Sequence, residues 1–253
     1  MNQNPNRRNF IKAAAIGAVA SLSIPQIVSA TVSPGRHKKI KIEKDDVILF
    51  QGDSITDWGR DHKNIVANSH GMLGTGYAML AAAHLLEKYP ELDLKIYNRG
   101  ISGNKVFQLA DRWDTDTLAF KPNILSIHVG VNDYWHTITS GYKGTIDNYI
   151  ADYHKLIERT KQALPDVKLI ICEPFAVKGV KAVDDSWYPT FDLFRKAASD
   201  IAIQYDAAFV PWQAVTDKAL ETAPAAYWSL DGVHPSVAGA ALMAHAWTET
   251  LKG

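Results

Sequence analysis

The stretch DVILFQGDSIT, residues 46–56, joins a strand-like run to a glycine, a carboxylate and a hydroxyl. Residues 47–50 are apolar in succession and do not alternate with polar residues, which is typical of a strand buried on both faces. This strand leads directly into Gly52-Asp53-Ser54. These three residues fit a simple turn, and they fit equally well a serine nucleophile held at the end of a sheet.

Further apolar runs of the same kind alternate with amphipathic segments along the chain. The expected strands are 46–50, 94–100, 124–130, 168–174 and 207–212, and the expected helices are 76–89, 105–113, 146–164, 191–205 and 235–252. This alternation predicts an α/β fold, in which helices bury both faces of a parallel sheet. Ligands of such sheets bind beyond the carboxyl ends of the strands, so the loops that follow the strands are the places to look for chemistry.

The chain has 253 residues, of which 47% are hydrophobic and 21% charged, enough for one large domain. Residues 1–30 have a basic start, a short apolar run and small residues near Ala30, which predicts an export signal. Its Arg7-Arg8 pair resembles the twin-arginine type. We therefore expect a signal at 1–30, a linker at 31–45 and a single domain at 46–253. After removal of the signal, the mature protein is expected in the periplasm or outside a bacterial cell, without stable membrane insertion. The alternative is that the segment is kept as an N-terminal membrane anchor.

The formal net charge of the whole chain is zero, which gives no electrostatic reason to expect nucleic acid as a partner. The single cysteine, Cys172, lies in an apolar run and is expected to be a core residue. His128 lies within an expected strand and is interpreted as a core histidine with satisfied hydrogen bonds. The histidines show no metal-ligand spacing and no phosphate-binding glycine motif occurs, so no metal and no nucleotide cofactor are expected.

Four loops carry the parts of an acyl-transfer site. Ser54 offers a hydroxyl, His234 an imidazole, and Asp231 a carboxylate three residues before that histidine, where it can hold the ring tautomer. Asn132 offers an amide donor and Gly103 an unobstructed backbone N–H. Together with the N–H of Ser54, these donors could form an oxyanion hole.

Asp53 is the alternative candidate for the acid that orients the histidine, because it neighbours Ser54. Adjacent residues of an extended chain point to opposite sides, so Asp53 is poorly placed to reach the far side of His234. We expect it to accept hydrogen bonds from nearby loop amides instead, and we assign the acid to Asp231.

These blocks resemble the SGNH branch of the GDSL esterase/lipase superfamily. Ser54 in GDSIT falls on the nucleophile of that family, Gly103 in ISGN and Asn132 in GVND on its oxyanion-hole donors, and Asp231 and His234 in DGVH on its acid and base. One departure is Ile55 in place of leucine. The resemblance implies a three-layer αβα sandwich with a flavodoxin-like, five-stranded parallel sheet. The longer matches look like bacterial acetylxylan esterases.

The resemblance implies a serine esterase that removes acetyl groups from small acylated substrates, in particular carbohydrates such as xylo-oligosaccharides. The alternatives are a broad short-chain esterase or lipase, a thioesterase, and a non-catalytic glycan-binding module. The segment HTITSGYKG, residues 136–144, is too short and polar for a lid, which disfavours long acyl chains. Trp58 and Trp135 lie closest in sequence to the catalytic candidates and are expected to be substrate-binding pocket walls. The particular sugar and the oligomeric state stay open.

Overall fold

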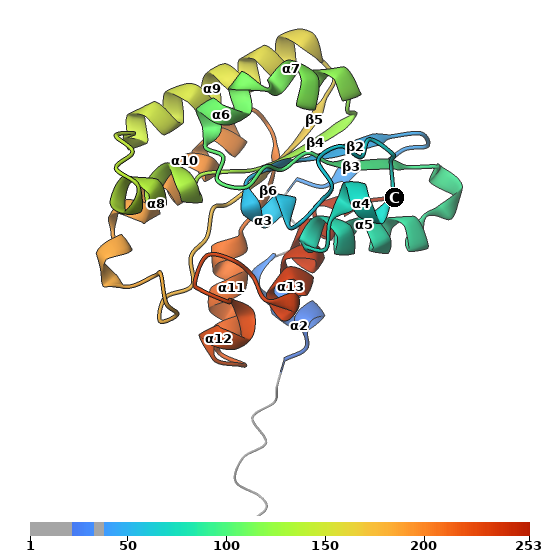
Figure 1. The fold of residues 1–253 in the computed structure, drawn as a ribbon. Coiled ribbons are helices and arrows are strands. Elements are labelled where there is room, and N and C mark those ends of the chain that lie inside the picture. Colours follow the sequence, from blue (N-terminus) through green and yellow to red (C-terminus); the bar gives the residue numbers. More distant parts are fainter. Residues whose placement is uncertain (1–21, 33–37) are drawn as a thin grey trace, which may run out of the picture.

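A single parallel sheet forms the centre of the molecule in the computed structural model, which describes residues 22–32 and 38–253 (Figure 1). Its five strands follow the spatial order β3-β2-β4-β5-β6, which is Lys95–Asn98, Val47–Gly52, Ile124–His128, Lys168–Cys172 and Ala208–Val210. Gly52 lies opposite His128, and His128 opposite Cys172. The carboxyl ends of three strands are therefore level at one edge. The predicted parallel α/β fold is confirmed, and its strand order is the flavodoxin-like one.

Helices cover both faces of this sheet (Figure 1). One layer consists of α6 (Val106–Asp111), α9 (Ile146–Ala163) and α10 (Thr190–Gln204). The other consists of α5 (Tyr77–Lys88), α11 (Trp212–Leu220) and α13 (Val237–Thr248). The short helices are α3 (Ser54–Asp57), α4 (His70–Leu73), α7 (Trp113–Asp116), α8 (Val131–Thr139), α12 (Ala225–Trp228), η1 (Pro90–Leu92), η2 (Leu118–Phe120) and η3 (Asp185–Trp187). In the described ranges, no helix is both long and apolar enough to span a membrane.

Helix α9 shows how local sequence determines these elements. The Thr145 side chain accepts a hydrogen bond from the Asn148 backbone, and the Asn148 side chain in turn accepts from the Thr145 backbone, which forms a capping box. The buried residues of α9 recur at helical spacing: Tyr149, Tyr153, Leu156, Ile157 and Thr160. The helix ends at Ala163, two residues before Pro165, because proline cannot continue the hydrogen-bonding pattern.

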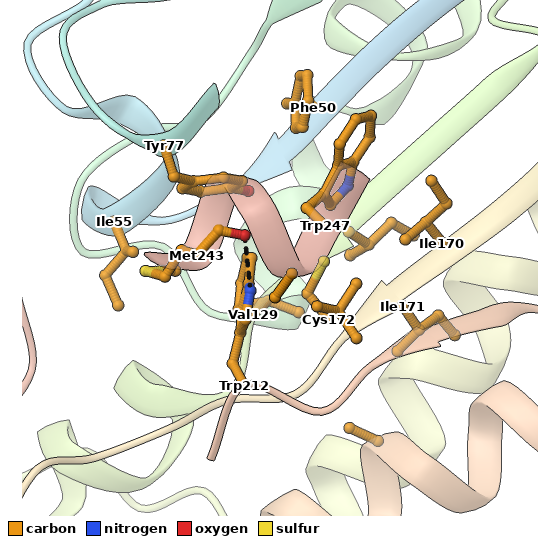
Figure 2. Close-up of a cluster of buried hydrophobic side chains, with 14 of the residues drawn as sticks. Phe50, Ile55, Tyr77, Val129, Ile170, Ile171, Cys172, Trp212, Met243 and Trp247 are labelled. Carbon is orange, nitrogen blue, oxygen red and sulfur yellow. Dashed lines mark hydrogen bonds between the residues drawn. The ribbon is translucent and has the colours of Figure 1, made fainter. Parts of the chain in front are cut away.

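Large aromatic side chains lie among aliphatic ones in the core beneath the layer of α5, α11 and α13 (Figure 2). The Trp247 ring lies 4.6 Å from that of Phe50, and its indole nitrogen donates to the Ser126 hydroxyl at 2.9 Å. The Trp212 indole nitrogen donates to the Met243 carbonyl at 3.2 Å. Both indoles thus satisfy their polar groups while burying their apolar area.

Two core residues complete this region. Cys172 is fully buried, as predicted, and burial raises its pKa to about 12, so the thiol is inert. His128 is also fully buried, with its ring 4.6 Å from that of Trp212. Neither of its ring nitrogens has a hydrogen-bond partner in the described chain, so the expectation of a satisfied histidine was wrong. Burial lowers the pKa of His128 to about 3, which keeps the ring neutral.

The two ends of the predicted domain differ from expectation. The last helix ends at Thr248, and the following Leu251–Lys252 forms strand β7 instead of continuing the helix to residue 252. Strand β7 pairs in parallel with β1, Ile40–Lys41, which lies in the segment expected as a linker. Ile40 and Ile42 are buried in the core, so this part of residues 31–45 is packed on the domain.

The end of the expected export signal is also helical. Helix α2 (Ile24–Thr31) packs against α11 and α13, and its Ile27 and Val28 side chains are buried. The Arg7-Arg8 pair lies outside the described residues.

Candidate active site

Ser54 stands at the first turn of a helix that begins where strand β2 ends. Asp53 caps this helix, because its carboxylate accepts the Ile55 backbone N–H at 3.0 Å. A Cβ on Gly52 would lie 2.4 Å from both the His128 carbonyl and the Thr56 hydroxyl, so only glycine fits at the strand end. Asp53 therefore accepts from a nearby backbone amide, but this amide belongs to the first turn of α3 and not to a loop as predicted. Ser54 is presented beyond the sheet edge.

His234 reaches Ser54 from the loop before α13. Its Nε2 atom lies 2.8 Å from the Ser54 hydroxyl, and its Nδ1 atom lies 2.8 Å from the Asp231 carboxylate. The other Asp231 oxygen accepts the backbone N–H groups of His234 at 2.7 Å and Val233 at 2.9 Å. One carboxylate thus fixes both the ring and the backbone of the histidine.

The ionisation of Asp231 decides the tautomer of this ring. Burial alone would raise the pKa of Asp231, but the hydrogen bonds from His234 and Val233 lower it below its ordinary value. A carboxylate that is charged can only accept, so Nδ1 of His234 carries the proton that faces it. In the neutral imidazole, Nε2 is then free to accept from the Ser54 hydroxyl.

The oxyanion candidates lie on the loops after β3 and β4. Gly103 has φ +80°, and a Cβ there would meet only the His136 ring, at 3.9 Å, so its backbone is open. Asn132 is buried in the first turn of α8, and its side-chain amide donates to the Asn104 carbonyl at 3.3 Å. This bond leaves the second amide hydrogen of Asn132 for another acceptor.

The hollow beside these groups holds about 370 Å³ and is lined by Ser54, Trp58, Gly59, Thr75, Ser102 and His234. Ser102 directly precedes Gly103. Among residues 22–32 and 38–253, no three His, Cys, Asp or Glu side chains gather as a metal-ion site would require.

The model of the GDSL-like lipase/acylhydrolase family matches residues 50–242, which include Ser54, Gly103, Asn132, Asp231 and His234. The chain belongs to this family. A curated relative, an acetylxylan esterase of Geobacillus stearothermophilus, is 37% identical over 217 residues, covering 84% of this chain and 96% of the relative. This GDSL-family protein is therefore a carboxylic ester hydrolase.

Solved structures agree with this family. A protein classed as a GDSL-like lipase, from Parabacteroides merdae, superposes with a TM-score of 0.83 at 52% identity, covering 84% of this chain and 98% of that one. The acetylxylan esterase Axe2 of Geobacillus stearothermophilus superposes with a TM-score of 0.76 at 34% identity, covering 83% and 96%. Structures of Axe2 with a serine, an aspartate or a histidine replaced by alanine are described as catalytic mutants.

Two tryptophans flank the imidazole of this GDSL-family esterase. The Trp58 and Trp135 ring centroids lie 5.8 Å and 6.2 Å from that of His234. The Trp58 side chain lies over Gly76, where an added Cβ would come within 2.7 Å of the Trp58 Cβ and 2.9 Å of its ring. Trp135 is backed by the buried Trp187 at 6.0 Å. Both predicted wall residues thus lie beside His234, and Trp58 lines the hollow.

Sequence reasoning missed the contact that holds the esterase's Gly103 loop in place. The buried Asp57, in the same short helix as Ser54, accepts both the backbone N–H of Ser102 at 3.0 Å and its hydroxyl at 2.9 Å. Arg60 donates to the Gly100 carbonyl at 2.7 Å. The two loops approach so closely that a Cβ on Gly100 would lie 2.5 Å from the Asp57 nitrogen. The only sequence signal was the carboxylate three residues after Ser54.

Two further carboxyl groups lie behind the esterase's site. Burial raises the pKa of Asp53 to about 7, and the neighbouring Asp133 charge acts in the same direction. Burial likewise raises the pKa of Asp133 to about 7, although its carboxyl accepts the Val106 backbone N–H at 3.1 Å. One oxygen of each carboxyl has no partner within the described chain. These groups contrast with Asp231, whose pKa is lowered.

Proposed function

We propose that this esterase hydrolyses short acyl esters, in particular the O-acetyl groups of carbohydrates, through an acyl-enzyme on Ser54. The observation that carries the proposal is the continuous chain from Ser54 through His234 to Asp231, with 2.8 Å at both links. This is the arrangement of a hydroxyl nucleophile, its general base and the group that orients the base.

In the first half-reaction, the Ser54 oxygen attacks the acyl carbon while His234 Nε2 takes the hydroxyl proton. The oxyanion formed accepts hydrogen bonds from the backbone N–H groups of Ser54 and Gly103 and from the Asn132 side chain. The bond to the alcohol oxygen then breaks, and His234 returns its proton to that oxygen. Asp231 balances the positive ring in between.

In the second half-reaction, water attacks the acyl carbon of the ester on Ser54, and His234 takes a proton from the water. The intermediate collapses to acetate and Ser54 recovers its hydroxyl proton from His234. Each step of this half-reaction mirrors a step of the first one in reverse, so Ser54, His234 and Asp231 serve both half-reactions.

The acetyl-carbohydrate preference is supported by the relatives and by the shape of the site. The relative from Geobacillus stearothermophilus is named an acetylxylan esterase, and its aspartate and histidine described as catalytic are three residues apart, as Asp231 and His234 are. The hollow of about 370 Å³, which Trp58 lines beside His234, suits a small acyl group on a sugar ring. We further propose that residues 1–30 direct export of the protein.

The test has two parts. Ser54→Ala should abolish hydrolysis of p-nitrophenyl acetate, whereas Ser140→Ala, an exposed serine at the end of α8, should leave it unchanged. Retention of most activity by Ser54→Ala would refute the assigned nucleophile. A panel of acetylated xylo-oligosaccharides, longer p-nitrophenyl esters and acyl thioesters then tests the substrate. Preference for long acyl chains or for thioesters would overturn the deacetylase assignment and leave the serine esterase standing.

A further inference from the structure

A partly exposed aromatic pair lies next to the Gly103 loop and has no part in the chemistry above. The rings of Phe107 and Tyr142 are stacked, with centroids 5.9 Å apart and planes inclined by 23°. Phe107 remains 37% exposed, although it is a large apolar side chain. The two residues come from α6 and from the loop between α8 and α9, so the pair is made by the fold.

Both rings have close neighbours in the fold. The ammonium group of the largely buried Lys105 lies 4.9 Å from the Tyr142 ring centroid and 5.9 Å from that of Phe107. The Tyr142 ring also lies directly against Gly144, where a Cβ would come within 2.2 Å of it. A rigid surface loses little entropy when it binds, which favours the use of such a pair in recognition.

A short series of contacts links the pair to the candidate active site. Lys105 and Phe107 follow Gly103 by two and four residues in the chain. On the other side, the Tyr142 backbone N–H donates to the His136 carbonyl at 3.1 Å, and the His136 ring faces Gly103. The neighbouring Trp135 has its ring 6.2 Å from that of His234. These contacts place the pair on the Gly103 and Trp135 side of the site, in the direction that a longer substrate bound at Ser54 could extend.

We propose that Phe107 and Tyr142 form a second sugar subsite, which binds a pyranose ring of an oligosaccharide remote from the ester under attack. A pyranose ring presents a face of C–H groups rimmed by hydroxyls, and a rigid aromatic surface can bury that face while the hydroxyls stay in water. This inference rests on the proposed deacetylase function, because it concerns a longer substrate of the same site.

The experiment compares small and extended substrates. Phe107→Ala, Tyr142→Ala and the double variant should keep kcat/KM for p-nitrophenyl acetate within about twofold, because the pair does not contact the acyl group. For acetylated xylotetraose, the double variant should show a KM about tenfold higher with kcat retained. Ile203→Ala, at another exposed apolar position, on α10, is the control and should change the kinetics with neither substrate.

Calorimetric titration with unacetylated xylotetraose measures the subsite without turnover, and should show weaker binding in the double variant. Equal binding, or an unchanged KM for the acetylated tetramer, would overturn the subsite. A change in oligomeric mass without any change in xylotetraose binding would mean that a second copy covers these rings, which also overturns it. Failure of the proposed function looks different: the unmodified protein would then hydrolyse p-nitrophenyl acetate but no acetylated carbohydrate.

Discussion

The bonds between Asp57 and Ser102 offer the sharpest test of how the site is held together. Asp57 belongs to the same short helix as Ser54, and its carboxylate accepts two hydrogen bonds from Ser102, at 3.0 Å and 2.9 Å. Ser102 precedes Gly103, the candidate oxyanion donor. We therefore expect Asp57 to act as a positioning residue, which sets where the Gly103 N–H points relative to the Ser54 oxygen.

The expected size of the effect follows from these contacts. Asp57→Ala removes both bonds, and the most it can release is the contribution of one oxyanion donor, about 100- to 1,000-fold in kcat. Asp57→Asn keeps one carbonyl oxygen that can accept both Ser102 groups, so most of kcat should return. Ser102→Ala removes only the hydroxyl bond, and its kcat should lie between those of these two variants. We expect a fall of about tenfold, since one hydrogen bond contributes up to about 1.5 kcal/mol and about 1.4 kcal/mol is a tenfold change in rate.

The assay is steady-state hydrolysis of p-nitrophenyl acetate, with chemical unfolding of each variant measured in parallel. A positioning role predicts a fall in kcat with KM nearly unchanged, because the oxyanion exists only in the transition state. A purely structural role predicts that Asp57→Ala is less stable but that its folded fraction keeps full kcat. That result, or a change confined to KM, would refute the reasoning.

Three further predictions concern the oxyanion site, buried charge and the N-terminus. Asn132→Ala should lower kcat for p-nitrophenyl acetate by about 100-fold or more with KM retained, and a change in KM alone would contradict its role as donor. Asp53→Asn keeps the acceptor for Ile55 but cannot ionise. Because burial raises the pKa of Asp53 to about 7, the folded protein binds more protons than the unfolded chain between about pH 4 and 7, and stability falls as pH rises through that window. Asp53→Asn lacks this loss, so its unfolding free energy minus that of the unmodified protein should rise by up to about 4 kcal/mol between pH 4 and pH 8. A difference that does not change with pH would contradict this. A chain starting at residue 31 loses the buried Ile27 and Val28, so it should be less stable than a chain starting at residue 22 by about 3–6 kcal/mol. Urea unfolding measures this difference. Equal midpoints and slopes for the two chains would contradict the packing of α2.

The sheet and the main helices could be predicted because their signals are local. A buried parallel strand is a continuous apolar run, and the end of α9 follows from Leu164 and Pro165. The sequence pattern does not predict helix α8, because its first residues carry the oxyanion candidates and its N-cap, Gly130, has φ +134°. Helix α2 was missed for a different reason: its small and apolar residues match an export signal, and only contacts with α11 and α13 show that they pack.

Within the site, too, local signals could be predicted and contacts between distant segments could not. The rule that function gathers at the carboxyl ends of parallel strands was enough to select Ser54, Asn132 and His234 from separate loops. It could not give the bond from Asp57 to Ser102, which depends on how closely two loops approach in three dimensions. The pairing of β1 with β7 was likewise out of reach, because it joins residues near opposite ends of the chain.

Three carboxyl groups of this esterase lie near its nucleophile in environments that differ. Asp231, held by three hydrogen bonds from His234 and Val233, has a lowered pKa and stays charged where the imidazolium forms. Asp53 and Asp133, next in sequence to Ser54 and Asn132, have pKa values raised to about 7 by burial. A negative charge on either would oppose an oxyanion formed in front of them.

The repulsion between a buried carboxylate and the oxyanion is large enough to measure. At a separation on the order of 8 Å and an effective dielectric constant of about 20, two like charges repel by about 2 kcal/mol. Ionisation of the buried pair should therefore lower kcat/KM above about pH 7, and Asp53→Asn should show a smaller fall between pH 7 and 9 than the unmodified protein. Identical pH profiles for Asp53→Asn and the unmodified protein would mean that the buried carboxyl groups do not act on the oxyanion. Their positions next to Ser54 and Asn132 would then matter only for folding.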